Sequence, residues 1–147
     1  MPGAISFPGP SARLGPVDTG GARPKKPSMT YALPFVALGG ALGATLRYLA
    51  LLAWPAPWGT LAINGAGALL IGLLAVPLLL SERGLHPLAP FLVTGVLGGF
   101  TTFSAFSLDT LRLIEGGRIG AAVTYAGGSV ALSLGACALG LWLGRLA

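Results

Sequence analysis

Four long apolar stretches constrain what this chain can fold into more than any other feature. They cover residues 31–53, 59–80, 87–108 and 119–143, and each is about 22 to 25 residues long. A helix rises about 1.5 Å per residue, so each stretch can cross a hydrocarbon core of ~30 Å. None shows the regular polar face that a soluble helix bundle needs. The sequence therefore predicts an all-α membrane protein with four transmembrane helices.

The residues before the first stretch differ in kind. Residues 1–28 are rich in Pro, Gly and Ser, carry four basic side chains and have no periodic apolar pattern. Such a segment cannot bury enough surface to offset its ordering entropy, so we expect a basic, disordered tail. Met29 would itself make a sensible start. Two interpretations stay open: a cytosolic extension, or residues that the native product does not contain. The four-span domain is expected to be residues 29–147.

The third stretch is interrupted by residues that disfavour a helix. Residues 95–108 read GVLGGFTTFSAFSL. Gly98 and Gly99 each lower helix propensity by about 1 kcal/mol relative to Ala, and Thr101 and Thr102 add β-branched crowding. A broken membrane helix leaves backbone groups without partners, which only protein, an ion or water can supply. We expect the third helix to be broken at mid-membrane, with the break as the functional centre.

Two polar side chains in the first two stretches need an explanation. Arg47 carries the only formal charge in any of the four. It either serves a structural or functional purpose or reaches the membrane surface with its long side chain. Asn64 places a carboxamide in an uncharged span, which is costly without partners. It is either a functional residue or the donor of a helix–helix hydrogen bond worth ~0.6 kcal/mol.

The remaining polar groups within the spans are neutral. Phe103 and Phe106 lie three residues apart beside the break, and hydroxyls recur at steps of four in the last stretch. The candidate residues are Thr60, Asn64, Thr102, Phe103, Ser104, Phe106, Tyr125, Ser129 and Ser133. Neutral donors suit a small anion that must shed water, because a full positive charge would trap it. The positive edge of a phenylalanine ring can also contact an anion.

Other classes of function are less well supported. The sequence has no metal-binding cluster, nucleophile–base pair or phosphate-binding loop, so neither an enzyme nor a nucleic-acid-binding protein is expected. A small drug or cation exporter needs an ionisable carboxylate within the membrane. Glu82, Asp109 and Glu115 are instead assigned to positions in or beside loops, because the third span is expected to end at Leu108. A membrane scaffold without transport activity is a further alternative.

Three motifs carry a family resemblance. GGALGATLRY, GTLAINGAGALLIG and GGFTTFSAFSLDT together resemble the bacterial fluoride channel family, known as Fluc or CrcB, and the likeness extends over residues 29–147. The resemblance implies a fluoride-selective channel in the bacterial inner membrane that exports fluoride passively. It also implies an antiparallel, dual-topology homodimer with two fluoride pores. Ala105 stands where the family commonly has Thr, and the tail has no usual counterpart.

The resemblance also assigns roles to residues. It implies a structural, non-transported sodium ion (Na⁺) held by the backbone carbonyls of Gly98 and Thr101. The family's pore phenylalanines correspond to Phe103 and Phe106, and its pore asparagine to Asn64. Its lining hydroxyls correspond to Tyr125, Ser129 and Ser133.

Arguments from the residues also favour two chains. Four helices are too few to enclose a polar pore, and one broken helix offers a hard cation only two carbonyl oxygens, whereas two chains offer four. Counted from Met29, each membrane side has two basic residues, as insertion in both orientations requires. These are Arg83 and Arg145 on one side, and Arg112 and Arg118 on the other. The tail would add four to the N-terminal side.

Overall fold

The computed structural model describes residues 29–80 and 86–146. A short helix, η1 (Met29–Ala32), leads into α1 (Leu33–Ala53), which is followed by α2 (Trp58–Leu78). A π-helix, η2 (Pro90–Leu97), continues into α3 (Gly98–Phe100) and, after two non-helical residues, α4 (Phe103–Glu115). The last element is α5 (Ile119–Gly144). The expected tail and residues 81–85, which include Glu82 and Arg83, lie outside the described residues.

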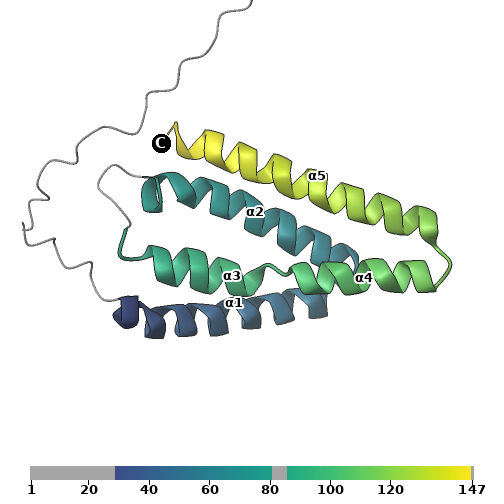
Figure 1. The fold of residues 1–147 in the computed structure, drawn as a ribbon, viewed down its shortest axis with the longest axis horizontal. Coiled ribbons are helices and arrows are strands. Elements are labelled where there is room, and N and C mark those ends of the chain that lie inside the picture. Colours follow the sequence, from purple (N-terminus) through teal and green to yellow (C-terminus); the bar gives the residue numbers. More distant parts are fainter. Residues whose placement is uncertain (1–28, 81–85, 147) are drawn as a thin grey trace, which may run out of the picture.

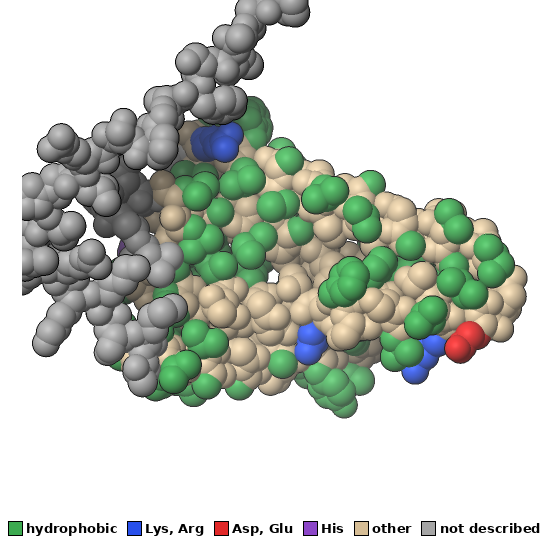
Figure 2. All heavy atoms as spheres, viewed as in Figure 1, with side chains coloured by type: hydrophobic (Ala, Val, Ile, Leu, Met, Phe, Trp, Pro, Cys, Tyr) green, Lys and Arg blue, Asp and Glu red, His purple; other side chains and the backbone are tan. Residues whose placement is uncertain are grey.

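Among the described residues, four segments are long and apolar enough to cross a membrane: Leu33–Ala53, Trp58–Leu78, Pro90–Glu115 and Ile119–Gly144. The outer surface agrees with this assignment. Large apolar side chains cover the face seen in Figure 2, with few charged groups among them. Leu38, Trp54 and Leu134, for example, are each at least two-thirds exposed. Water would not favour such a surface, whereas lipid would. The predicted four-span helical class is confirmed.

The helices associate in two pairs. Helix α2 packs along α5, and α1 packs along η2 and α3. Figure 1 shows α3 beside α1, while α4 reaches the far end of α5. The chain thus crosses from one pair to the other at residues 101–102, between α3 and α4. This crossing places the non-helical residues between the two pairs.

Glycines allow the helix backbones to approach closely. On α1, Gly39 and Gly43 are buried against η2 and α3. A Cβ at Gly39 would lie 2.9 Å from the Cα of Gly95, and one at Gly43 would clash with the Val96 carbonyl. Because these neighbours are backbone atoms, a change of rotamer cannot relieve the overlap. Gly39 and Gly43 therefore form a small-residue packing surface on the first span.

The third span extends beyond Leu108, where it was expected to end. Helix α4 continues to Glu115, and Gly117, with a φ of 72°, lies in the turn that follows. The assignment of Asp109 to the third loop was therefore wrong, whereas Glu115 is the last residue of α4 and lies beside that loop. An acidic side chain does not end a helix when a hydrogen-bond partner compensates its burial, and Asp109 has such a partner. The Gly116–Gly117 pair was the better signal for the helix end.

Replacing Gly43 by Ala should destabilise the protein. The added Cβ would clash with the Val96 carbonyl and lie 2.8 Å from the Phe100 nitrogen, an overpacking that typically costs ~1–3 kcal/mol. The matched control is Gly40→Ala on the same helix, where a Cβ meets nothing within 4 Å. Thermal unfolding of the purified protein in detergent measures both. Equal melting temperatures for the two variants would contradict the packing argument.

Candidate functional site

The chain leaves helical conformation at Thr101 and Thr102. Their backbones are extended, with φ and ψ of −77° and 157° at Thr101 and −155° and 116° at Thr102. An α-helix would bond the Thr102 N–H to the carbonyl of Gly98, four residues earlier. That bond cannot form here, so the backbone groups of this interruption need other partners. The structure supplies them from two neighbouring helices.

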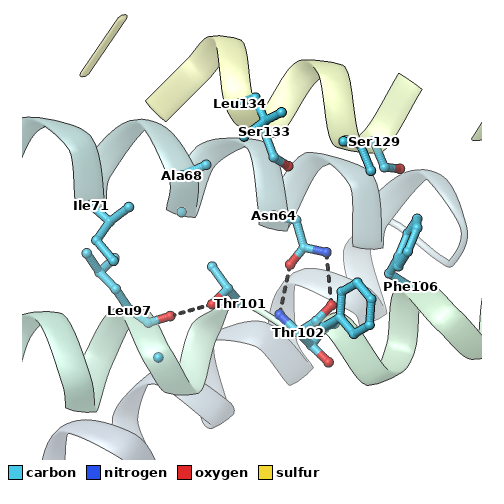
Figure 3. A pocket seen from close by; sticks show the side chains of 14 residues that line it. Asn64, Ala68, Ile71, Leu97, Thr101, Thr102, Phe106, Ser129, Ser133 and Leu134 are labelled. Atoms are coloured by element: carbon cyan, nitrogen blue, oxygen red, sulfur yellow. Dashed lines mark hydrogen bonds between the residues drawn. The ribbon is translucent and has the colours of Figure 1, made fainter. Parts of the chain in front are cut away.

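Asn64 binds both backbone groups of Thr102. Its Oδ1 accepts from the Thr102 N–H at 2.8 Å, and its Nδ2 donates to the Thr102 carbonyl at 2.9 Å. Figure 3 shows both bonds reaching from α2 across to the interruption. The carboxamide therefore replaces two lost helical partners. A hydrogen bond between helical segments, one of the two interpretations open for Asn64, is therefore observed. One of the two hydrogens on Nδ2 is not used by these bonds.

Arg47 also serves the interruption. Its guanidinium Nη1 donates to the Thr101 carbonyl at 3.1 Å. The side chain is half-buried and reaches from α1. The charge thus contacts a backbone carbonyl inside the helical region, which gives it a structural partner. This contact involves one of the two carbonyls that the family resemblance assigns to sodium.

The two threonine hydroxyls are engaged locally. Thr102 caps α4: its Oγ1 accepts from the Ala105 N–H at 3.2 Å and lies 3.2 Å from the Ser104 Oγ. Thr101 Oγ1 donates to the Leu97 carbonyl at 2.9 Å. Side-chain oxygens at an N-cap satisfy donors of the first helical turn. Thr102 therefore restarts the helix directly after the interruption.

A groove of about 410 Å³ runs beside the interruption. It brings together most of the residues expected to form the site: Asn64, Gly98, Thr101, Thr102, Phe103, Phe106, Ser129 and Ser133. Ser129 and Ser133 come from α5, across the groove from Thr101 and Thr102 (Figure 3). The remaining lining is apolar side chains and a glycine. Thr60, Ser104 and Tyr125 do not line this groove.

Ser129 has an unsatisfied hydroxyl. The residue is only 5% exposed, and its Oγ has no hydrogen-bond partner among the residues that the structure describes. A buried hydroxyl left without a partner costs about 1–3 kcal/mol. Native proteins rarely keep such a group without a reason. Ser129 is also one of the residues that line the groove.

Phe103 and Phe106 differ in how far their side chains are buried. Phe103 is 77% exposed, whereas Phe106 is half-buried. Their ring centroids are 5.3 Å apart, and the Phe106 ring lies 5.7 Å from the ring of Tyr125. The three rings form a chain from the rim of the groove to the interior of the α4–α5 contact. Phe103 therefore presents most of its surface away from its own chain.

The sequence interpretation missed a buried polar cluster at the end of this chain of rings. Thr60 is fully buried and donates to Asp109 Oδ2 at 2.7 Å, and Tyr125 Oη donates to the same oxygen at 3.5 Å. Asp109 itself is 7% exposed. The signal for this role was periodicity, since Phe106, Asp109 and Leu113 share one helix face. Thr60 and Tyr125, both expected as residues of the ion pathway, contact this carboxylate.

Replacing Thr60 by Val should destabilise the protein by about 1–3 kcal/mol, because the buried Asp109 carboxylate would lose its short hydrogen bond. The matched control is Thr45→Val. Thr45 is exposed, and its hydroxyl bonds to the Ala41 carbonyl of its own helix, so its loss should have little effect. Thermal unfolding in detergent compares the two. A similar shift in both variants would show that the cluster contributes no special stability.

Comparisons with known proteins identify similar sequences. A family profile described as "CrcB-like protein, Camphor Resistance (CrcB)" matches residues 34–141. A protein of Paracoccus denitrificans is 57% identical over 115 residues, covering 75% of this chain and 91% of that protein. One of Cereibacter sphaeroides is 50% identical over 119 residues, covering 77% and 94%. A third, of a Ruegeria species, is 49% identical over 117 residues, covering 75% and 91%. All three are named fluoride-specific ion channel FluC.

Proposed function

Because the chain belongs to the CrcB-like protein family, we propose that it is a fluoride channel that lets fluoride leave the cytoplasm passively. Its four apolar spans and its family together make it a multi-pass protein of the bacterial inner membrane. The relatives are named as channels, and the chain is not an enzyme. Passive export would protect the cell from fluoride. The substrate is a small anion, and the surrounding partner is membrane lipid.

The unsatisfied Ser129 hydroxyl carries the assignment of the pathway to the groove. An anion at this point would accept the hydrogen bond that the protein leaves unmade. Ser133 lies four residues further along the same helix, about 6 Å away along its axis, and also lines the groove. Neutral donors in series bind an anion weakly enough for it to move on. Asn64 can add its second amide hydrogen.

The phenylalanine rings supply the other side of the proposed pathway. Ring hydrogens carry partial positive charge, so ring edges can replace part of the hydration shell of fluoride. Phe106 and Phe103 both line the groove with Ser129. The pathway would then pass between hydroxyls of α5 and ring edges of α4. Thr102 and Ser104 lie at the start of α4, with their hydroxyl oxygens 3.2 Å apart. Each hydroxyl would contact the anion only when it does not bond to the other.

Changing Phe106 to Ile keeps much of the bulk but removes the ring edge. Fluoride efflux from liposomes should fall by roughly tenfold or more, which corresponds to a barrier increase of about 1.4 kcal/mol. Phe103→Ile should act in the same direction. The matched control is Phe35→Ile, because Phe35 is exposed on α1 and lies outside the groove. Unchanged efflux in both pathway variants, with intact protein, would exclude a role for the rings.

The same assay tests the proposed function. Liposomes with the unaltered protein should release fluoride down its gradient, release far less chloride, and do so equally with or without a protonophore. The protonophore matters because a small dimeric drug or cation exporter is the alternative. Asp109, which lies within α4 and is buried, could serve such a pump as its carboxylate. Fluoride release that stops when the protonophore is added would favour the exporter. No fluoride release under either condition would favour a scaffold.

An antiparallel, dual-topology homodimer would complete the site. Support comes from surfaces that the single chain leaves open. Phe103 is 77% exposed, and a Cβ added at Gly98 would meet only the Val93 carbonyl, at 3.7 Å. Gly98 therefore has space on its own chain, and a second chain could approach there. The equal basic counts on the two sides, taken from Met29, suit insertion in both orientations.

A structural sodium ion would fit the carbonyls at this contact. The Thr102 N–H, which would otherwise bond to the Gly98 carbonyl, is held by Asn64, so Gly98 has an oxygen to offer. The Thr101 carbonyl accepts from Arg47 and keeps a second lone pair. One chain supplies two oxygens, and a hard cation takes more. Two chains related by a two-fold axis would supply four.

Sodium should stabilise the protein if this site exists. At a sodium concentration one hundred times the dissociation constant, binding adds about 2.7 kcal/mol to stability. Purified protein stripped of sodium should therefore melt at a lower temperature and recover when sodium is returned. A large organic cation at equal ionic strength is the control. If neither the melting temperature nor the fluoride flux differed between sodium and the organic cation, the sodium site would be excluded.

A further inference from the structure

A second hollow lies at the opposite end of the buried polar cluster from the groove. It has a volume of about 320 Å³ and shares no lining residue with the groove. Its walls come from the start of α2, the end of α4 and the first turns of α5. Trp58, Leu113, Arg118 and Tyr125 are among its lining residues. The function proposed above does not use this space.

The order of residues along α5 connects the two spaces. Ser133 and Ser129 line the groove, and Tyr125, one turn further toward the start of α5, lines the second hollow. Each step of four residues advances about 6 Å along the helix. The Tyr125 ring packs against Phe106, which lines the groove. The two spaces therefore lie in succession on the same helix, with Tyr125 between them.

We call the buried polar layer that adjoins the second hollow at Tyr125 the partition. It consists of Thr60, Asp109 and Tyr125, which are 0%, 7% and 2% exposed. Thr60 is held tightly on Asp109 at 2.7 Å, whereas the Tyr125 hydroxyl is at 3.5 Å, the outer limit of a hydrogen bond. The Tyr125 hydroxyl is thus the weakly held donor of the layer. A hydroxyl held this loosely can turn to an anion that arrives through the second hollow, which Tyr125 lines.

Arg118 gives the second hollow its charge. Among the described residues it is the only cationic side chain that lines either space. It lies directly before α5 and is exposed. The Asp109 carboxylate in the partition would repel an approaching anion, and a cation in front of it offsets this repulsion. Because Arg118 is solvated, it can attract an anion without holding it.

We propose that this second hollow is an outer mouth of the fluoride pathway, where Arg118 concentrates the anion before it passes Tyr125. The inference rests on the proposed channel function and extends the pathway from the groove to one membrane surface. Arg118 acts here on the local fluoride concentration, since it lies in front of the partition and not within the groove. Its effect should therefore depend on ionic strength.

The first test replaces Arg118 by Gln in liposome efflux measured at low fluoride. Flux should fall about threefold at low ionic strength, the effect of one charge at a distance of roughly 7 Å in water. The difference should vanish near 1 M of an impermeant salt, where the screening length is only about 3 Å. The matched control is Arg112→Gln. Arg112 is exposed near the same end of α4 but does not line the hollow, so its loss should change flux less.

A second test probes the hollow itself. A Cβ at Gly120, another lining residue, meets nothing within 4 Å, so Gly120→Cys should fold, in a Cys137→Ala background. An anionic methanethiosulfonate reagent on both membrane faces should then reduce flux, and a cationic one of similar size should reduce it less. Any of three results would overturn the proposal. Arg118→Gln could leave the fluoride flux unaltered, Arg112→Gln could reduce the flux equally, or the anionic and cationic reagents could reduce it equally. Absent fluoride flux in the unaltered protein would instead overturn the channel function.

Discussion

The paired hydrogen bonds between Asn64 and Thr102 are the interaction on which the centre of this protein depends. In an apolar surrounding, each unsatisfied backbone group costs several kcal/mol. The carboxamide satisfies an N–H and a carbonyl together, so the chain can leave one helix and begin another within two residues. Thr102 then caps α4, which sets the direction of Phe103 and Phe106. The same bond keeps the Thr102 N–H away from the Gly98 carbonyl.

The sequence was sufficient to predict the features that follow from local composition. The four spans, and several of the polar groups that line the groove, follow from hydropathy, helical spacing and the cost of burying polar atoms. Ser129 and Ser133 were found in this way. A helical step of four residues specifies one face without any knowledge of the neighbouring helix.

Pairings between distant residues could not be obtained from one sequence. Asn64 and Thr102 are 38 positions apart, and Arg47 and Thr101 are 54 apart. Hydropathy shows that such side chains need partners but not which partners they find. Asp109 was misplaced for the related reason that a charged residue near the end of an apolar stretch is normally solvated. Hydrogen bonds from Thr60, 49 residues away, and from Tyr125 compensate its burial.

The distribution of charge along the proposed pathway explains how an anion could move through it. Arg47 is engaged at the interruption by the Thr101 carbonyl, and Asp109 is held by Thr60 and Tyr125. Between these two charged residues, the groove is lined by neutral donors and ring edges. A charge whose hydrogen bonds are already directed at the protein shapes the local field but offers a passing ion less direct contact. Arg118, exposed at the second hollow, can attract an anion where water still screens it. In this arrangement strong attraction is confined to the solvated mouth, and the dehydrated interior offers only weak sites, which is the condition for an ion both to enter and to leave.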